Sequence, residues 1–300
     1  MSELLKGTGV AIITPFHDSG NIDFGSFGKI IEHIIGGGVN YIVALGTTGE
    51  SVTLSRDEKV AVLEFVAEIV NKRVPVVAGF GGNNTQEVIN TIKSCSFEGI
   101  DAILSVCPYY NKPQQKGLYI HYKAIAGVCP VPVILYNVPA RTSVNITPET
   151  VLRLAGDFSN IIGIKEASGN LMQCMEIIND RPQGFLVISG DDALTLPMLA
   201  LGADGVISVV ANAFPREFSE MVNLSLKGKF TKARTLHFNL LKFTNALFMD
   251  GNPSGIKAAM EILGLCKSNV RLPLVKVNKN VHSLIAEQVE FILKNQIEMS

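Results

Sequence analysis

The sequence lacks the features of a membrane, nucleic-acid-binding or secreted protein. It has 26 Lys and Arg residues against 27 Asp and Glu residues, so a net charge of −1 gives no basic field for nucleic acid or anionic lipid. Apolar residues occur in short, interrupted runs and never in the ~20 consecutive positions that cross a bilayer. The first residues contain no apolar stretch typical of a secretory signal. These absences indicate a cytoplasmic, soluble protein that binds neither nucleic acid nor membranes.

Metal and redox motifs are also missing. The five cysteines and five histidines are scattered, and no C-x-x-C pair occurs. Free thiols buried in a reducing compartment are the simpler interpretation. The Gly79–Asn84 segment resembles a dinucleotide-binding motif, but Asn84 stands where the last glycine should be. We interpret this segment as a tight turn.

Apolar material is ample, because 47% of the 300 residues are hydrophobic and only 18% are charged. One pattern repeats along the chain: a short β-branched run, a polar loop, and a stretch of helical periodicity. Most runs are apolar nearly throughout, which is typical of strands buried on both faces of a parallel sheet. Eight runs occur: Gly9–Phe16, Tyr41–Leu45, Val74–Phe80, Ala102–Val106, Val131–Asn137, Ile161–Ala167, Phe185–Ser189 and Gly205–Val210.

Helix signals fill the intervals between these runs. Ser55 and Glu58 form a capping box, Asp23 precedes an apolar stripe, and Thr147 with Pro148 begins another helix. Strands that alternate with helices predict parallel βαβ units. Eight units match a closed (β/α)₈ TIM barrel, which is an α/β fold. The alternative is an open doubly wound sheet, which would usually show a glycine fingerprint after its first strand.

Strand signals stop after Val210, and the rest of the chain has helical patterns without a flexible linker. The C-terminal helices are predicted at Phe230–Phe248, Ser254–Leu263 and Ser283–Asn295. We therefore expect a catalytic barrel over residues 1–228 and a C-terminal helical region, residues 229–300, docked on it.

A lysine within the sixth apolar run is the most informative residue. Strand alternation places Lys165 on the same face as Ile161 and Gly163. If that face is the barrel interior, burial favours the neutral amine, which can attack a ketone to form a Schiff base. The alternative is a structural ion pair with Glu166 or Asp191, because a buried charge needs a partner.

Polar residues also follow other strands, at the end of the barrel where TIM-barrel active sites lie. Gly46–Glu50 can hold a carboxylate on backbone N–H groups and hydroxyls, or it can be a turn with a helix cap. Tyr109, Tyr110 and Tyr136 can shuttle protons, although such tyrosines are more often packing residues.

Two charged segments complete this set. Arg141 can hold a carboxylate with two parallel hydrogen bonds. Gly190–Asp192 can hold a metal, although two adjacent acids more often cap a helix. Together with Lys165 and the loop after the second strand, these residues favour carbonyl chemistry without a metal or an organic cofactor.

The same residues resemble a known family. Along essentially its whole length, the chain is similar to the dihydrodipicolinate synthase and N-acetylneuraminate lyase family of pyruvate-dependent class I aldolases. The resemblance rests on Gly46–Glu50, Tyr110, Tyr136 and Gly163–Glu166, which are highly specific in combination. It implies a TIM barrel, a Schiff-base lyase that needs no cofactor or metal, and a homo-oligomer, expected to be a tetramer.

Three features favour the synthase branch over the sialate lyases. The loop has Thr47 where the lyases typically have serine, Arg141 is present, and Gly190–Asp192 follows the synthase pattern. The resemblance then implies condensation of pyruvate with L-aspartate 4-semialdehyde, in lysine and diaminopimelate biosynthesis. One alternative is a related aldolase that acts on sialate or another 2-keto-3-deoxy sugar acid. A catalytically silent barrel that serves as a binding protein is the other.

The resemblance also implies a role for each matching residue. Lys165 forms the Schiff base with pyruvate, and Tyr136 protonates and orients the intermediates. Thr47 links Tyr136 to Tyr110 in a proton relay, with Tyr110 reaching across a subunit interface. The substrate-binding residues are Thr47 and Thr48 for the pyruvate carboxylate, Arg141 for the semialdehyde carboxylate, the main chain near Ile207 for the pyruvyl group, and Gly190.

One departure from the family pattern concerns feedback by lysine. In the lysine-inhibited bacterial enzymes, histidines commonly follow the Gly-Thr-Thr-Gly-Glu-Ser segment, whereas this chain has Arg56 and Lys59. Lys59 adds a cation that repels an incoming ammonium, unless its side chain swings into solvent. We expect weak or absent inhibition. The candidate effector site comprises Ser51, Arg56, Lys59, Asn83, Glu87 and Tyr109.

Overall fold

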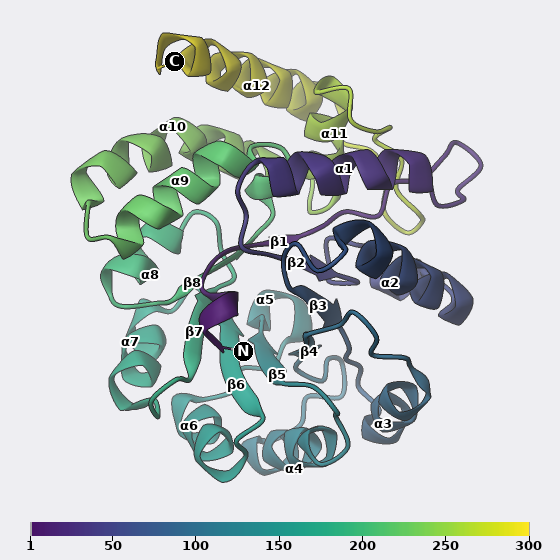
Figure 1. Ribbon diagram of the computed structural model, residues 1–300, viewed down its shortest axis with the longest axis vertical. Coiled ribbons are helices and arrows are strands. Elements are labelled where there is room, and N and C mark those ends of the chain that lie inside the picture. Colours follow the sequence, from purple (N-terminus) through teal and green to yellow (C-terminus); the bar gives the residue numbers. More distant parts are fainter. Residues whose placement is uncertain (1, 300) are drawn as a thin grey trace.

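Eight parallel strands form a closed barrel in chain order, with the last strand paired to the first (Figure 1). The computed structural model describes residues 2–299, with side chains described for residues 2–295. The strands are β1 Gly7–Ala11, β2 Tyr41–Ala44, β3 Val76–Gly79, β4 Ala102–Val106, β5 Val133–Asn137, β6 Ile161–Glu166, β7 Leu186–Ser189 and β8 Gly205–Ser208. The predicted (β/α)₈ TIM barrel is confirmed, and the open doubly wound sheet is wrong.

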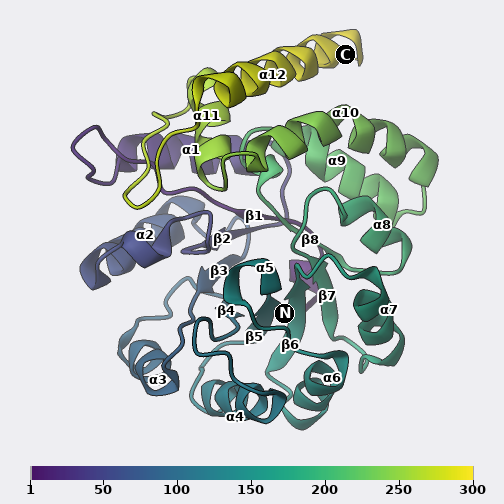
Figure 2. The same ribbon diagram turned by 180° about the vertical axis from the view of Figure 1, so that it is seen from behind.

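Helices surround the barrel (Figures 1 and 2). They are α1 Phe24–Gly36, α2 Arg56–Val70, α3 Thr85–Ser94, α4 Gln115–Ala126, α5 Pro139–Thr142, α6 Pro148–Asp157, α7 Leu171–Asp180, α8 Thr195–Ala200 and α9 Pro215–Leu226. Short 3₁₀ helices lie at η1 Ser2–Leu5, η2 Ser51–Thr53 and η3 Val210–Asn212. The predicted capping box is present at α2, where Ser55 and Glu58 satisfy each other's backbone N–H groups.

Two apolar layers stabilise this arrangement. An outer layer packs the strands against the helices, and a separate cluster fills the barrel interior. Leu5 of η1 belongs to the interior cluster, together with Tyr41, Ile134, Ile188 and others. Figure 1 shows η1 in front of the barrel, so it covers the amino ends of the strands. The carboxyl ends of the strands, at the opposite end of the barrel, are therefore left for an active site.

The C-terminal region forms three helices, α10 Phe230–Phe248, α11 Ser254–Ile262 and α12 Lys279–Met299. The predicted C-terminal helical extension is thus confirmed, with α12 longer than expected. Both views place α12 outermost, beside α10 and α11 (Figures 1 and 2). We keep the division at residue 228 as a prediction, and the end residues of the predicted ranges, 1 and 300, lie outside the described residues.

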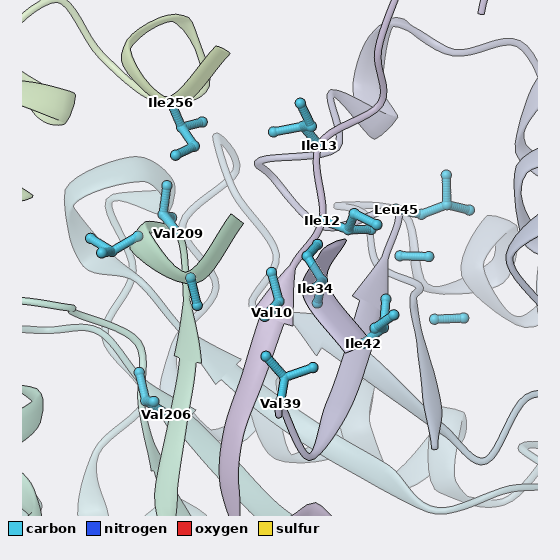
Figure 3. Close-up of a cluster of buried hydrophobic side chains, with 14 of the residues drawn as sticks. Val10, Ile12, Ile13, Ile34, Val39, Ile42, Leu45, Val206, Val209 and Ile256 are labelled. Carbon is cyan, nitrogen blue, oxygen red and sulfur yellow. The ribbon is translucent and has the colours of Figure 1, made fainter. Parts of the chain in front are cut away.

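Two predicted strands extend at least two residues too far at their carboxyl ends. β1 stops at Ala11, and the apolar residues that follow it are buried for another reason: Ile13 belongs to the outer apolar layer together with Ile256 of α11, which lies to its left in Figure 3. β8 stops at Ser208, because the Asp192 carboxylate accepts the N–H groups of Val209 and Val210 and turns the chain into η3. Apolar character alone does not distinguish a strand from a buried turn.

The predicted alternation along β6 is partly wrong. The register with β5 shifts by one residue between the pairs Val133–Ile161 and Ile134–Gly163. As a result Ile161 packs in the outer layer, while Gly163 faces Leu186 of the interior cluster. This β-bulge leaves Lys165 on the interior face, as predicted, but separates it from the face of Ile161.

Within residues 2–299, the helices are too short or too polar for one of them to cross a bilayer. All five cysteines are free thiols, two of them buried and three partly buried. Burial raises the pKa of the Cys107 and Cys174 thiols to about 12, so neither is poised as a thiolate nucleophile.

Candidate active site

A cavity of about 550 Å³ opens beside the carboxyl ends of β2 to β5. Thr47, Tyr136 and Arg141 line it, although they come from different segments of the chain. All six residues of the candidate effector site line the same cavity: Ser51, Arg56, Lys59, Asn83, Glu87 and Tyr109. The site therefore continues outward from the strand ends toward the surface of α2 and α3.

Lys165 does not itself line the cavity but lies against Tyr136, which does. Its side chain is 6% exposed, and Nζ lies 4.5 Å from the centre of the Tyr136 ring. The pairing of β5 with β6 sets Tyr136 directly opposite Lys165. Gly190 provides the space beside the lysine, because a Cβ atom there would lie 3.0 Å from Lys165 Cε and 2.6 Å from Ala167 Cβ. Ile207 lies in the same interior cluster as Tyr136.

The structural ion pair offered as an alternative for Lys165 is absent from the described part of the chain. Glu166 accepts instead from Asn137 Nδ2 at 3.0 Å, Gln173 Nε2 at 2.9 Å and the Ser168 N–H at 2.6 Å. Asp191 accepts from backbone N–H groups of the following turn. A buried lysine without a carboxylate partner favours the nucleophile interpretation.

The neighbours of Glu166 form what we call the amide cluster, which consists of Asn137, Asn145, Gln173 and Glu166. Asn137 Nδ2 also donates to Asn145 Oδ1 at 2.7 Å, and Asn145 Nδ2 donates to Gln173 Oε1 at 2.8 Å. Asn137 and Glu166 are buried, and each lies one position after a predicted reactive residue. The cluster thus joins β5 to β6 at the ends that carry Tyr136 and Lys165.

The loop Gly46–Glu50 forms tight turns after β2. The N–H groups of Gly49 and Glu50 donate to the carbonyls of Gly46 and Thr47, both at 3.1 Å. Thr14 Oγ1 donates to the Gly49 carbonyl at 2.7 Å. The loop ends at Glu50, whose φ of 54° lies in the left-handed region. Of its two hydroxyl residues, Thr47 lines the cavity, whereas Thr48 is buried and does not.

Asn252 is a site residue that sequence reasoning missed. Its Nδ2 donates to Thr48 Oγ1 at 3.0 Å, and its carbonyl accepts from Arg141 Nη2 at 3.5 Å. Arg141 is exposed on α5, which lies over the barrel opening (Figure 2). Asn252 precedes α11 in the C-terminal region, more than 200 residues from Thr48, so no local pattern marks this contact.

Tyr110 stands apart from the other predicted residues. Its side chain is 88% exposed, its φ is 73°, and it does not line the cavity. Among residues 2–295, no side-chain hydrogen bond joins Thr47 to Tyr136 or Tyr110, so the relay stays a prediction. A tyrosine so exposed is available to a second subunit.

The two aspartates after β7 have structural partners. Asp191 Oδ1 accepts the N–H of Ala193 at 2.9 Å, which is a turn-capping contact. Asp192 is buried, and burial raises the pKa of its carboxyl to about 6. No group of His, Cys, Asp or Glu side chains suited to a metal occurs among the described residues. Of the two interpretations of this segment, the capping role fits.

Charged residues of the candidate effector site are loosely held. Arg56 Nη2 donates to Ser94 Oγ at 3.0 Å. Within the described side chains, neither Lys59 nor Glu87 takes part in an ion pair, and Glu87 is exposed. Asn111 Nδ2 fixes the backbone of Asn83 at 2.9 Å.

Comparisons with known proteins agree with this geometry. Residues 4–292 match the model of the dihydrodipicolinate synthetase family. A 4-hydroxy-tetrahydrodipicolinate synthase of Parabacteroides distasonis is 50% identical over 283 residues, which cover 94% of this chain and 95% of the relative.

Solved structures give the same result. The 4-hydroxy-tetrahydrodipicolinate synthase of Methylacidiphilum fumariolicum SolV is 41% identical, with a TM-score of 0.95 over 98% of each chain. A variant described as the first monomeric dihydrodipicolinate synthase variant is 37% identical, with a TM-score of 0.94 over 97% of each chain. With its closed barrel and its buried, unpaired lysine, the chain belongs to the dihydrodipicolinate synthetase family.

Proposed function

We propose that this chain is a Schiff-base-forming lyase that condenses pyruvate with L-aspartate 4-semialdehyde, a step of lysine and diaminopimelate biosynthesis. The observation that carries the proposal is Lys165, a buried amine without an ion-pair partner, which contacts the Tyr136 ring. The names of the relatives support the choice of substrates. Arg141 at the cavity favours a second substrate that carries its own carboxylate, as the semialdehyde does, over an uncharged sugar aldehyde.

The reaction proceeds through the amine of Lys165. Neutral Nζ attacks C2 of pyruvate, and loss of the carbonyl oxygen as water gives an iminium ion. Loss of a proton from C3 gives an enamine, whose C3 attacks the aldehyde carbon to form a new C–C bond and a hydroxyl. The amino group of the second substrate then attacks the iminium carbon. This attack closes the ring, and departure of Lys165 then leaves a C=N bond in the ring and regenerates the free amine.

The other site residues hold or protonate these intermediates. Tyr136 stands against Nζ and exchanges protons with the oxygen that leaves C2. Thr47 and Thr48 hold the pyruvate carboxylate, and the main chain near Ile207, with Gly190, borders the pyruvyl group. Arg141 binds the carboxylate of the semialdehyde. No metal or organic cofactor is required, because the iminium ion itself withdraws electrons from C3.

Two measurements test this function. Borohydride reduction in the presence of pyruvate adds one reduced pyruvyl group, which peptide mass spectrometry locates on Lys165. Turnover with pyruvate and aspartate semialdehyde exceeds any release of pyruvate from N-acetylneuraminate. An adduct on another lysine contradicts the assignment of the nucleophile, and faster cleavage of N-acetylneuraminate contradicts the assignment of the substrates.

The chain assembles as a homo-oligomer, proposed to be a tetramer in the cytoplasm. Tyr110 is 88% exposed and Val52 is 82% exposed, and both follow strands that border the cavity. Burial of these side chains against a second copy completes the proton relay from Thr47. Tyr110→Phe lowers turnover more than it lowers stability, since only a hydroxyl is lost. A fully active monomer in sedimentation experiments contradicts this assembly.

Lysine inhibits this enzyme weakly or not at all. Lys59 stands in the cavity without an ion-pair partner among the described residues. At an effective dielectric constant of ~20, an ammonium ~6 Å from that cation costs about 2–3 kcal/mol before screening. Activity is titrated with L-lysine, for the wild type and for Lys59→His. Half-inhibition of the wild type below millimolar lysine contradicts the argument.

A further inference from the structure

The end of the loop Gly46–Glu50 is held by a fully buried ion pair from the C-terminal region. Glu50 is 2% exposed and Lys257 of α11 is 0% exposed, and the two form an ion pair. The other carboxylate oxygen of Glu50 accepts the backbone N–H of Arg271 at 2.9 Å. Lys257 Nζ also donates to the Asn269 carbonyl at 2.8 Å. Both charges are thus fully partnered, as a buried pair requires.

An aromatic ring completes the surroundings of this pair. Lys257 Nζ lies 4.1 Å from the centre of the Phe16 ring, and the Arg271 guanidinium carbon lies 4.6 Å from it. Arg271 also holds α2 through Glu58, with Nη1 donating to Oε2 at 2.8 Å. Ile256, next to Lys257, packs toward Val209 above the barrel (Figure 3). α11 is therefore fixed to the barrel at the position from which it reaches the loop.

A second contact reaches the same loop from the same region. Asn252 Nδ2 donates to Thr48 Oγ1, the hydroxyl proposed to hold the pyruvate carboxylate. We call the contacts of Asn252, Lys257 and Arg271 with the loop the tether. It grips the loop at two positions, Thr48 and Glu50, and the first of these carries one of the two hydroxyls.

We infer that Glu50 and Lys257 are positioning residues of the pyruvate site, which set the place of Thr47 and Thr48 relative to Lys165. The inference rests on the proposed function. Neither residue touches the substrate. They act through the loop, and through them the C-terminal helices contribute to substrate binding.

The loop needs such an anchor for a physical reason. It follows β2 and lacks the ladder of hydrogen bonds that fixes Lys165 and Tyr136 on their strands. Its last residue adopts a left-handed backbone, which a non-glycine residue holds only where surrounding contacts enforce it. Displacement of binding groups by ~1 Å can cost ~10²-fold in rate, so release of Glu50 affects the bound pyruvate.

Three variants distinguish an effect on the position of the pyruvate-binding loop from an effect on folding stability: Lys257→Met, Glu50→Gln, and the two combined. Lys257→Met leaves a buried carboxylate unpaired, so its thermal midpoint falls. The double variant removes both charges and regains much of that midpoint, because an apolar replacement of a buried pair is often tolerated. We expect its KM for pyruvate to remain raised about tenfold or more, with a smaller change in kcat.

Borohydride trapping at a series of pyruvate concentrations measures the affinity of each variant for pyruvate in the absence of the second substrate. The matched control is Asp204→Asn, which breaks the partly buried pair with Arg181 at the opposite, amino end of the strands. It should lower the thermal midpoint and leave KM for pyruvate unchanged.

The outcomes are distinct. A double variant with wild-type KM and wild-type trapping overturns the inference, and so does an equal rise of KM in Asp204→Asn. A wild type that forms no adduct refutes the proposed function itself. A raised KM confined to the variants at residues 50 and 257 supports the tether.

Discussion

The two sides of the cavity are held by different kinds of contact. On the strand side, the amide cluster surrounds Glu166 with neutral donors, and its contacts to this carboxylate span only 29 and 7 residues along the chain. On the loop side, the Glu50 carboxylate contacts the charged amine of Lys257 and a backbone N–H of Arg271, which lie 207 and 221 residues away. Both sides bury one carboxylate, yet only Glu50 faces a cation.

The difference follows from what each side must do. The strand side carries the covalent step, and a cationic partner for Glu166 would place a further positive charge one residue from Lys165, where the iminium ion forms. Neutral amides satisfy the carboxylate without that charge. The loop side only positions hydroxyls and lies outside the sheet, so it can use a strong ion pair from a distant segment.

The largest expected effect lies on the strand side. Lys165→Arg should abolish both the borohydride adduct and turnover, by about 10⁴-fold or more, because a guanidinium stays protonated and cannot attack a ketone. Intact-mass measurement and a coupled assay check this. Lys242→Arg is the control: it makes the same change at an exposed lysine of α10, and the adduct on Lys165 should persist. Residual turnover in Lys165→Arg would contradict the assignment of the covalent step to Lys165, and with it the contrast between the strand side and the loop side.

The second prediction concerns the amide cluster. Glu166→Gln keeps the shape but turns an NH₂ group toward the donors of Asn137, Gln173 or Ser168, so at least one buried donor loses its acceptor. We expect kcat to fall about 10–100-fold, through misplacement of Tyr136 relative to Lys165. Steady-state kinetics and the rate of adduct formation measure this.

An exchange of the two groups sharpens this prediction. In Asn137→Asp combined with Glu166→Gln, the amide and the carboxylate trade places, so the inter-strand hydrogen bond can form again. Much of the lost kcat should return. If the double variant is no faster than Glu166→Gln alone, then the charge of Glu166, and not its bridge to β5, is what the site requires.

A third change, on α5, should affect binding of only one substrate. Arg141→Ala should spare the pyruvate adduct and weaken use of the semialdehyde about 10- to 100-fold, since a charge-assisted pair contributes about 1.5–3 kcal/mol. KM values for the two substrates, measured separately, provide the check. An equal loss of pyruvate affinity would place Arg141 in the wrong part of the site.

The smallest expected effect on catalysis concerns Asp192, which is buried and contributes to stability through its proton. Folding raises the pKa of this carboxyl from an ordinary 3.8 to about 6, chiefly through burial. The stabilisation by the bound proton is complete below the unfolded pKa and is lost as the pH rises through about 6.

Asp192→Asn should remove this dependence. Its Oδ1 can still accept from Val209 and Val210. Relative to the wild type, the free energy of unfolding of the variant should rise by up to about 3 kcal/mol between pH 4 and pH 7.5. Urea unfolding at several pH values tests this, and a difference between the two proteins that does not change with pH would contradict it.

The sequence predicted the strand side far better than the loop side. The interior position of Lys165 could be predicted from alternation along its strand, although the bulge puts Ile161 on the other face, and Tyr136 could be placed at the carboxyl end of a strand. The helix starts at Asp23 and Ser55 were likewise local signals and are confirmed. The short helix α5 was not predicted, since four residues carry no periodicity.

The tether could not be predicted because its partners are distant in the chain. Lys257 and Glu50 each look like an ordinary surface charge on a helix or after a turn, and only the docking of α11 on the barrel makes them a buried pair. The same limit applies to Asn252, whose neighbour Thr48 lies at the other end of the sequence. Sequence patterns predict which face a side chain occupies and where a helix begins, whereas contacts between residues distant in the chain become visible only in the folded structure.

The bulge in β6 has a consequence for protein engineering. Because the register shift lies before Gly163, the extra residue affects only the first part of the strand. Deletion of Ile162 would restore regular alternation there without re-aiming Lys165, whereas deletion of Ile164 would turn the lysine outward, away from the interior. The strand thus tolerates loss of a residue before Gly163 but not after it, and transfer of this lysine to another barrel requires only the part of the strand from Gly163 onward.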